Sequence, residues 1–167
     1  MNLRENAMAI YNREQPDFYG DLMDAIVLVP DPVLMGDMCP QDGLEHKDSW
    51  GTVYVYKPGA PGPHPRVNSE NAVIKDIEKW EEQLTVPDLD HLDWTLVKEE
   101  AAKVDRREKF VGFMCAGGLF ERSHHLMGME EALVNYLEYP DEMAALLRVI
   151  ADYKNKVYQD GGRTDPP

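Results

Sequence analysis

The sequence predicts an α/β fold, in which a few short strands alternate with longer amphipathic helices. Three segments have strand character: residues 25–30 (AIVLVP), 51–57 (GTVYVYK) and 109–118 (KFVGFMCAGG). Each is a short run rich in apolar, β-branched or aromatic side chains. The third is apolar almost throughout, which is typical of a strand buried on both faces of a parallel sheet. Strands that alternate with helices along the chain favour the α/β class.

Helical periodicity fills the first part of the chain around these strands. Residues 2–14 are expected to form a short helix that ends before Pro16, because proline interrupts helical hydrogen bonding. Residues 69–84 predict a second helix with Ser69 as its N-cap, and residues 95–108 a charged third helix.

Two more helices are expected after the third strand. The first of them has apolar side chains near helical spacing at Leu126, Met129, Leu133 and Leu137. The last helix begins at Pro140, a favoured first position, and two acidic residues in its first turn complement the helix dipole. Its apolar stripe consists of Met143, Leu146, Leu147, Ile150 and Val157.

The remaining segments predict loops. Residues 30–50 are acidic and rich in turn-forming residues, and residues 58–65 (PGAPGPHP) contain too much proline for a regular element. Cys115 lies in an apolar strand and is expected to be a small buried hydrophobe. Cys39 lies in an acidic loop, which disfavours a reactive thiolate.

Composition excludes several classes of protein. The 167 residues are 43% hydrophobic, which is enough for a core, and the formal net charge is −14. A charge of this sign repels nucleic acids and anionic membranes. Two distant cysteines do not make a disulfide framework. The charged N-terminus and the lack of an 18-residue apolar run predict a cytoplasmic protein without a signal peptide or membrane span.

Residues 117–128 (GGLFERSHHLMG) are the strongest candidate site. They follow the third strand, and barrel enzymes place their chemistry in loops after strands. Glu121 and the imidazoles of His124 and His125 could orient a substrate or handle a proton. The two histidines point to different sides of a helix, so no shared metal ion is expected. The alternative is structural: Glu121 caps the helix, and the histidines are packing or surface residues.

Residues 110–153 resemble the uroporphyrinogen decarboxylase superfamily, and within it the corrinoid- and folate-linked methyltransferases and aromatic O-demethylases. Residues 4–17, 48–65 and 74–94 resemble, in order, the first helix, the "D-WG" segment and the stretch before the central helix of that family. The matching positions in the main segment are Phe120, Glu121, Leu126, Gly128, Glu130, Leu133, Leu137, Pro140 and Glu142.

The resemblance implies a partial TIM-barrel-like fold, because the family forms a barrel of about twice this length. Residues 1–158 would be the N-terminal part of a uroporphyrinogen decarboxylase-like domain, and residues 159–167 a tail. The chain would then be a fragment, a truncated gene product or one half of a split protein. Open strand edges and uncovered helices would require a homo-oligomer or a complementary half-chain.

The function implied by the resemblance is methyl transfer between a small-molecule methyl donor and a corrinoid protein or tetrahydrofolate. Glu121 and His125 would be catalytic, and His124, Arg122 and Trp50 would bind substrate. The chain has neither the family's "H-C…C" zinc ligands nor a DxHxxG cobalamin motif, so any corrinoid would be carried by a partner.

Two alternatives to methyl transfer stay open. One is a decarboxylase for an acidic substrate, although the arginine-rich signature of the true decarboxylases is missing and only scattered arginines such as Arg66 and Arg122 are present. The other is a non-catalytic subunit that needs a partner.

Overall fold

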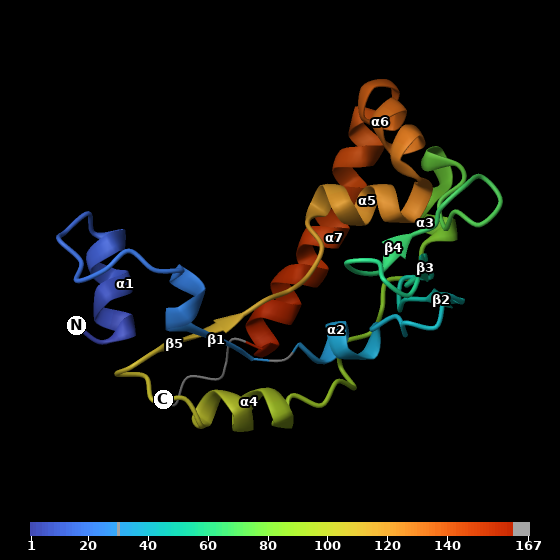
Figure 1. The fold of residues 1–167 in the computed structure, drawn as a ribbon. Coiled ribbons are helices and arrows are strands. Elements are labelled where there is room, and N and C mark those ends of the chain that lie inside the picture. Colours follow the sequence, from blue (N-terminus) through green and yellow to red (C-terminus); the bar gives the residue numbers. More distant parts are fainter. Residues whose placement is uncertain (30, 162–167) are drawn as a thin grey trace. The chain divides into compact units, whose positions relative to one another are not determined.

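The computed structural model describes residues 1–29 and 31–161, and their contacts divide the chain into two units (Figure 1). The first unit contains residues from 1–32 and 92–115 together with the C-terminal end of the last helix. The second unit contains residues 33–91 and 116–157. The α/β class predicted from the sequence is confirmed. Residues 162–167 of the predicted tail lie outside the described residues.

A pair of parallel strands forms the centre of the first unit. β1 (Ile26–Val29) pairs with β5 (Phe110–Phe113), so that Ile26 lies opposite Phe110 and Val29 opposite Phe113. This confirms two predicted strands, and it agrees with the parallel sheet expected for the third segment, although which strand pairs with it was not predicted. β5 is shorter than the apolar run, and its side chains are half-buried rather than enclosed on both faces.

Helix α4 (Thr95–Ala102) provides much of the apolar packing around this strand pair. Val97 and Ala101 on α4 are buried together with Val29 of β1. Trp94, Val111 and Phe113 pack against these three side chains. The helix was predicted to continue to residue 108 and ends earlier.

A turn built by the side chain of Asp105 replaces the last part of that predicted helix. The Asp105 carboxylate accepts hydrogen bonds from the backbone N–H of Arg107 at 2.9 Å and from the Arg107 guanidinium. Such local side-chain bonds compete with helical backbone bonds.

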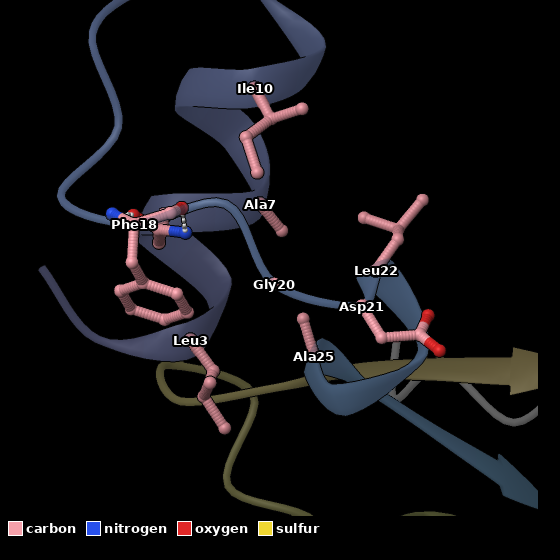
Figure 2. Close-up of a pocket in the computed structure, with 9 residues that line it drawn as sticks. Leu3, Ala7, Ile10, Phe18, Gly20, Asp21, Leu22 and Ala25 are labelled. Carbon is pink, nitrogen blue, oxygen red and sulfur yellow. Dashed lines mark hydrogen bonds between the residues drawn. The ribbon is translucent and has the colours of Figure 1, made fainter.

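Helix α1 (Leu3–Tyr11) begins at a complete capping box, in which Asn2 and Glu5 each bond the other's backbone N–H. The buried Asn6 donates to the Phe18 carbonyl at 2.8 Å, which ties the following loop to the helix. Figure 2 shows the small hollow between α1 and the 3-10 helix η1 (Leu22–Ala25). Its lining is mainly apolar, and its one carboxylate, Asp21, caps η1.

The second unit contains an antiparallel three-stranded sheet. β3 (Val53–Val55) is the central strand, and β2 (Glu45–Lys47) and β4 (His64–Pro65) flank it. β3 confirms the strand predicted in residues 51–57. The two flanking strands and α2 (Pro32–Gly36) lie in segments predicted to be irregular, so that prediction was wrong in part. Strands this short carry little periodicity in sequence.

In the described part of the chain, three helices follow β5: α5 (Leu119–Met127), α6 (Met129–Glu138) and α7 (Pro140–Gly161). α7 begins at Pro140 as predicted. Its predicted stripe is largely confirmed, since Met143, Leu146, Ile150 and Val157 are buried and Leu147 is half-buried.

The apolar stripe predicted for residues 126–137 is wrong beyond its first member. Leu126 is fully buried, but Met129, Leu133 and Leu137 are exposed. The reason is Gly128, whose φ of 97° ends α5 and starts α6 in a new direction. The predicted stripe assumed one uninterrupted helix through residues 126–137.

The helix predicted for residues 69–84, with Ser69 as N-cap, is also wrong over its first half. Only η2 (Ile77–Lys79) and α3 (Trp80–Gln83) are helical. The Asn68 side chain accepts from the backbone N–H of Glu70 at 2.9 Å and holds a turn instead. The N–H groups of Val73 and Ile74 both donate to the carbonyl of Leu126, a distant partner that periodicity does not reveal.

Candidate functional site

The candidate site lies in the second unit, where the segment from Asp48 to Tyr54 meets helix α5. The turn at Asp48 precedes β3, and its carboxylate accepts from the backbone N–H of Trp50 at 3.0 Å and of Thr52 at 2.8 Å. Gly51 has a φ of 85°, which favours glycine in this turn. The turn therefore fixes a carboxylate at the start of β3.

Arg122 of α5 forms an ion pair with that carboxylate. Its Nη1 donates to the second oxygen of Asp48, and the side chains are 15% and 3% exposed, respectively. The guanidinium carbon also lies 5.1 Å from the centroid of the Trp50 ring, a cation–π geometry. Trp50 is itself buried and packs edge-on against Tyr153 of α7 at 4.8 Å.

His125 lies on the same helix and is held by β3. The hydroxyl of Tyr54 lies 2.9 Å from His125 Nδ1, and the two rings meet edge-to-face with centroids 5.7 Å apart. The Thr52 hydroxyl donates to the His125 carbonyl at 3.2 Å. Thr52 directly precedes β3 and Tyr54 lies within it; residues two apart in an extended chain point to the same side, so both side chains reach α5.

Burial keeps both partners of this contact neutral. It raises the pKa of Tyr54 to about 12. The nearby Arg122 cation opposes this shift, because it would stabilise the phenolate. Burial, followed by the nearby His124 and Arg122, lowers the pKa of His125 to about 4. At neutral pH the site therefore contains an uncharged phenol and an uncharged imidazole beside a compensated ion pair.

His124 and Glu121 complete the segment predicted from sequence. The ring of His124 lies 4.4 Å from that of His125 and nearly perpendicular to it, and 5.2 Å from the ring of Phe120. Glu121 is exposed, and its carboxylate folds back over Gly118, the N-cap of α5. That position suits the favourable interaction of an acid with a helix N-terminus.

The structure thus brings together Trp50, Arg122, His124 and His125 of the predicted site, and it leaves Glu121 at the solvent edge. Sequence reasoning placed Asp48 only in the acidic loop of residues 30–50, without a role in the site, and it missed Tyr54. Both lie in segments with a detectable signal: Asp48 opens the "DSWG" turn, and Tyr54 belongs to the alternating run of β3. Catalytic and substrate-binding roles for the predicted residues remain predictions.

In the part of the chain that the structure describes, no three histidine, cysteine, aspartate or glutamate side chains are grouped to hold a metal ion. Over the same residues, no helix combines the length and the apolar character needed to cross a membrane. No protein-family model matches the chain, and no curated protein or solved structure is significantly similar to it.

Proposed function

We propose that this chain is the N-terminal part of a uroporphyrinogen decarboxylase-like methyltransferase, which moves a methyl group between a small-molecule donor and a corrinoid protein or folate. One observation carries the proposal. Two separate segments of the family resemblance, residues 48–65 and 110–153, meet through the Asp48–Arg122 ion pair and the Tyr54–His125 contact, whose partners are 74 and 71 positions apart in the chain.

The parallel pair β1–β5 supports the barrel part of the proposal. In a TIM barrel, consecutive strands are parallel, and a helix lies between them in the chain. β1 and β5 are parallel, and α4 precedes β5 in the chain and packs with both strands. We assign this pair to the first strands of a barrel that other strands would complete.

The methyl acceptor belongs to a partner in this proposal. A corrinoid protein would supply the cobalt that exchanges the methyl group, and no residue of this chain is assigned to hold it. Zinc chemistry does not fit the described residues, because their side chains form no group of metal ligands. No step is therefore assigned to a zinc ion here.

The role of this chain is to hold the donor and stabilise its leaving atom. When the methyl carbon leaves an oxygen, the bonding electron pair stays on that oxygen, which then needs a proton or a hydrogen bond. His125 is the best-placed group, because its ring is fixed by β3. Glu121 is our second candidate and His124 a weaker one, while Arg122 and Trp50 shape the wall beside them.

The rival decarboxylase receives less support from the side chains. An acidic substrate needs arginines that are free to pair with it. Arg122 is paired with Asp48, and Arg66 with Glu45 at 2.8 Å. The rival non-catalytic subunit is favoured by the exposed apolar side chains of α6 and shares with our proposal the need for a partner.

A spectroscopic assay tests the proposal. The chain, with any protein that copurifies with it, is mixed with free cob(I)alamin and anisole, and methylation is followed by absorbance. We expect methyl transfer that His125→Ala slows about 10²–10³-fold, the usual effect of removing one hydrogen-bond donor to an oxygen that gains negative charge. His64→Ala, on the exposed strand β4, is the matched control and should leave the rate unchanged. Absence of transfer from every methoxy donor, with a chain that is folded and partnered, contradicts the proposal.

A further inference from the structure

The two ring nitrogens of His125 have different environments. Nδ1 lies 2.9 Å from the Tyr54 hydroxyl. Nε2 forms no hydrogen bond with any residue that the structure describes. The ring cannot rotate freely, since it meets Tyr54 edge-to-face and lies 4.4 Å from the perpendicular ring of His124. Among the described residues, one nitrogen therefore has a hydrogen-bond partner and the other has none.

The chemistry of the pair sets the direction of the hydrogen bond. A phenol is the stronger acid, and an unprotonated imidazole nitrogen is the stronger base, so the hydroxyl donates and Nδ1 accepts. The raised pKa of Tyr54 and the lowered pKa of His125 agree with a bond between two neutral groups. In a neutral imidazole the proton occupies the nitrogen that does not accept. Nε2 then carries the hydrogen.

We propose that Tyr54 is a positioning residue that holds His125 in its Nε2–H tautomer, so that His125 offers a neutral hydrogen-bond donor to an oxygen atom of the methyl donor. This inference rests on the proposed function and narrows its substrate class. An ether oxygen has lone pairs that accept from Nε2–H, whereas a quaternary methylammonium group has none. The site therefore favours oxygen-linked methyl groups.

A neutral donor also suits the change in charge during transfer. A corrinoid on a partner would supply the nucleophile that accepts the methyl carbon; the carbon–oxygen bond would break, and its electron pair would stay on the oxygen, which would leave as an alkoxide or phenoxide. The hydrogen bond from Nε2–H strengthens as negative charge develops there, because bonds to charged acceptors are shorter and stronger. His125 keeps its proton in this step, so its role is electrostatic rather than that of a proton donor.

The tautomer can be measured without any catalytic assay. In ¹⁵N-histidine-labelled protein, long-range ¹H–¹⁵N spectra distinguish Nε2–H from Nδ1–H. We expect the Nε2–H pattern for His125 in the wild-type chain at neutral pH and a mixture of tautomers in Tyr54→Phe. The matched control is Tyr136→Phe, whose lost hydroxyl contacts Ser123 at 2.9 Å, and which should leave the His125 pattern unchanged.

Two outcomes overturn the role of Tyr54: the Nδ1–H pattern in the wild-type chain, or an unchanged pattern in a folded Tyr54→Phe variant. The wild-type spectrum can overturn this role even if that variant does not fold, because an Nδ1–H pattern excludes a hydrogen bond from the Tyr54 hydroxyl to Nδ1. Adding anisole then tests the substrate class, and the Nε2 signal should shift with anisole but not with tetramethylammonium. A correct tautomer without an anisole response would refute the substrate class and count against the proposed function, while leaving the tautomer role of Tyr54 intact.

Discussion

At the scale of single residues, the side chain of Asp48 connects the turn before β3 to helix α5 in the candidate site. Its carboxylate is almost fully buried, and it bonds two backbone N–H groups and the Arg122 guanidinium. A buried charge that loses its partner is costly, because the remaining charge stays desolvated. The stability of this unit should therefore depend on Arg122 far more than on arginines at the surface.

We predict that Arg122→Met lowers the free energy of unfolding by about 3 kcal/mol, the usual cost of breaking a buried ion pair. Urea denaturation followed by tryptophan fluorescence measures the change. Arg66→Met is the matched control, because the Arg66–Glu45 pair is exposed (66% and 53%) and should contribute less than about 1 kcal/mol. Equal losses of unfolding free energy in the two variants would show that the buried Asp48–Arg122 pair stabilises the chain no more than an exposed pair does. Adding Asp48→Asn to Arg122→Met should recover part of the loss, since no unpaired charge then remains.

The lowered pKa of His125 should make the free energy of unfolding depend on pH. Its pKa is about 4 in the folded chain and near 6.5 when unfolded, so between these values the unfolded chain binds the extra proton. The contribution of neutral His125 to the free energy of unfolding should be fully present above pH 6.5 and should be lost as the pH falls from 6.5 to about 4. His124 and Arg122 oppose protonation of the ring, and Asp48 and Glu121 favour it more weakly.

The measurement is a urea series at several pH values, with His125→Gln as the reference variant. Subtracting the two curves removes the contributions of all other titrating groups. We expect the wild-type chain to lose more stability than the variant between pH 6.5 and 4. Parallel curves would mean that His125 titrates alike in the folded and unfolded chain.

At the scale of elements, Gly128 separates two helices that the sequence pattern joins. Its φ of 97° is unfavourable for any residue with a Cβ, and a Cβ there would meet no other atom. With a ψ of 154°, Gly128 lies in a region that only glycine readily adopts, so the cost of Gly128→Ala is that of the backbone, about 1–3 kcal/mol. Gly62→Ala is the control, since Gly62 has open space without a positive φ. Calorimetry should show a lower melting temperature for Gly128→Ala alone.

The elements also show what could be predicted from the sequence. β1 and β5 could be predicted because their apolar runs are local features, but their pairing with each other could not, because a further predicted strand lies between them in the chain and belongs to a separate sheet. The turn that begins at Asn68 has a local cause, but the placement of Val73 and Ile74 could not be predicted, because both N–H groups bond the carbonyl of Leu126, more than 50 residues away. The exposed position of Leu133 depends on one glycine dihedral angle rather than on side-chain spacing.

The candidate site, too, could be predicted only in part. The segment containing His125 stood out because polar residues follow an apolar strand. Tyr54 did not, because alternation along β3 shows that Thr52 and Tyr54 share a face but not what lies opposite that face. Only tertiary structure places the Tyr54 hydroxyl on His125 Nδ1.

At the scale of the whole molecule, exposed apolar side chains and the net charge have opposite effects on self-association. Met129, Leu133 and Leu137 are spaced four residues apart on α6 and form one exposed apolar stripe, with Leu137 85% exposed. Among the described residues, β1 and β5 pair only with each other. These features favour association, whereas a formal charge of −14 makes copies of the chain repel each other.

We therefore predict that the purified chain self-associates, and that salt strengthens the association. Salt screens the repulsion between acidic surfaces, with a Debye length of about 10 Å at 0.1 M, and leaves apolar contacts intact. Sedimentation velocity should show the 19.1 kDa monomer at low ionic strength and larger species as salt is added. Leu137→Glu should keep the chain monomeric at higher salt than the wild type, because it places a charge in the apolar stripe. Tyr11→Glu, which changes an equally exposed side chain outside that stripe, is the matched control. A wild-type chain that stays monomeric at every ionic strength would contradict this view and would favour a complementary half-chain as the missing partner.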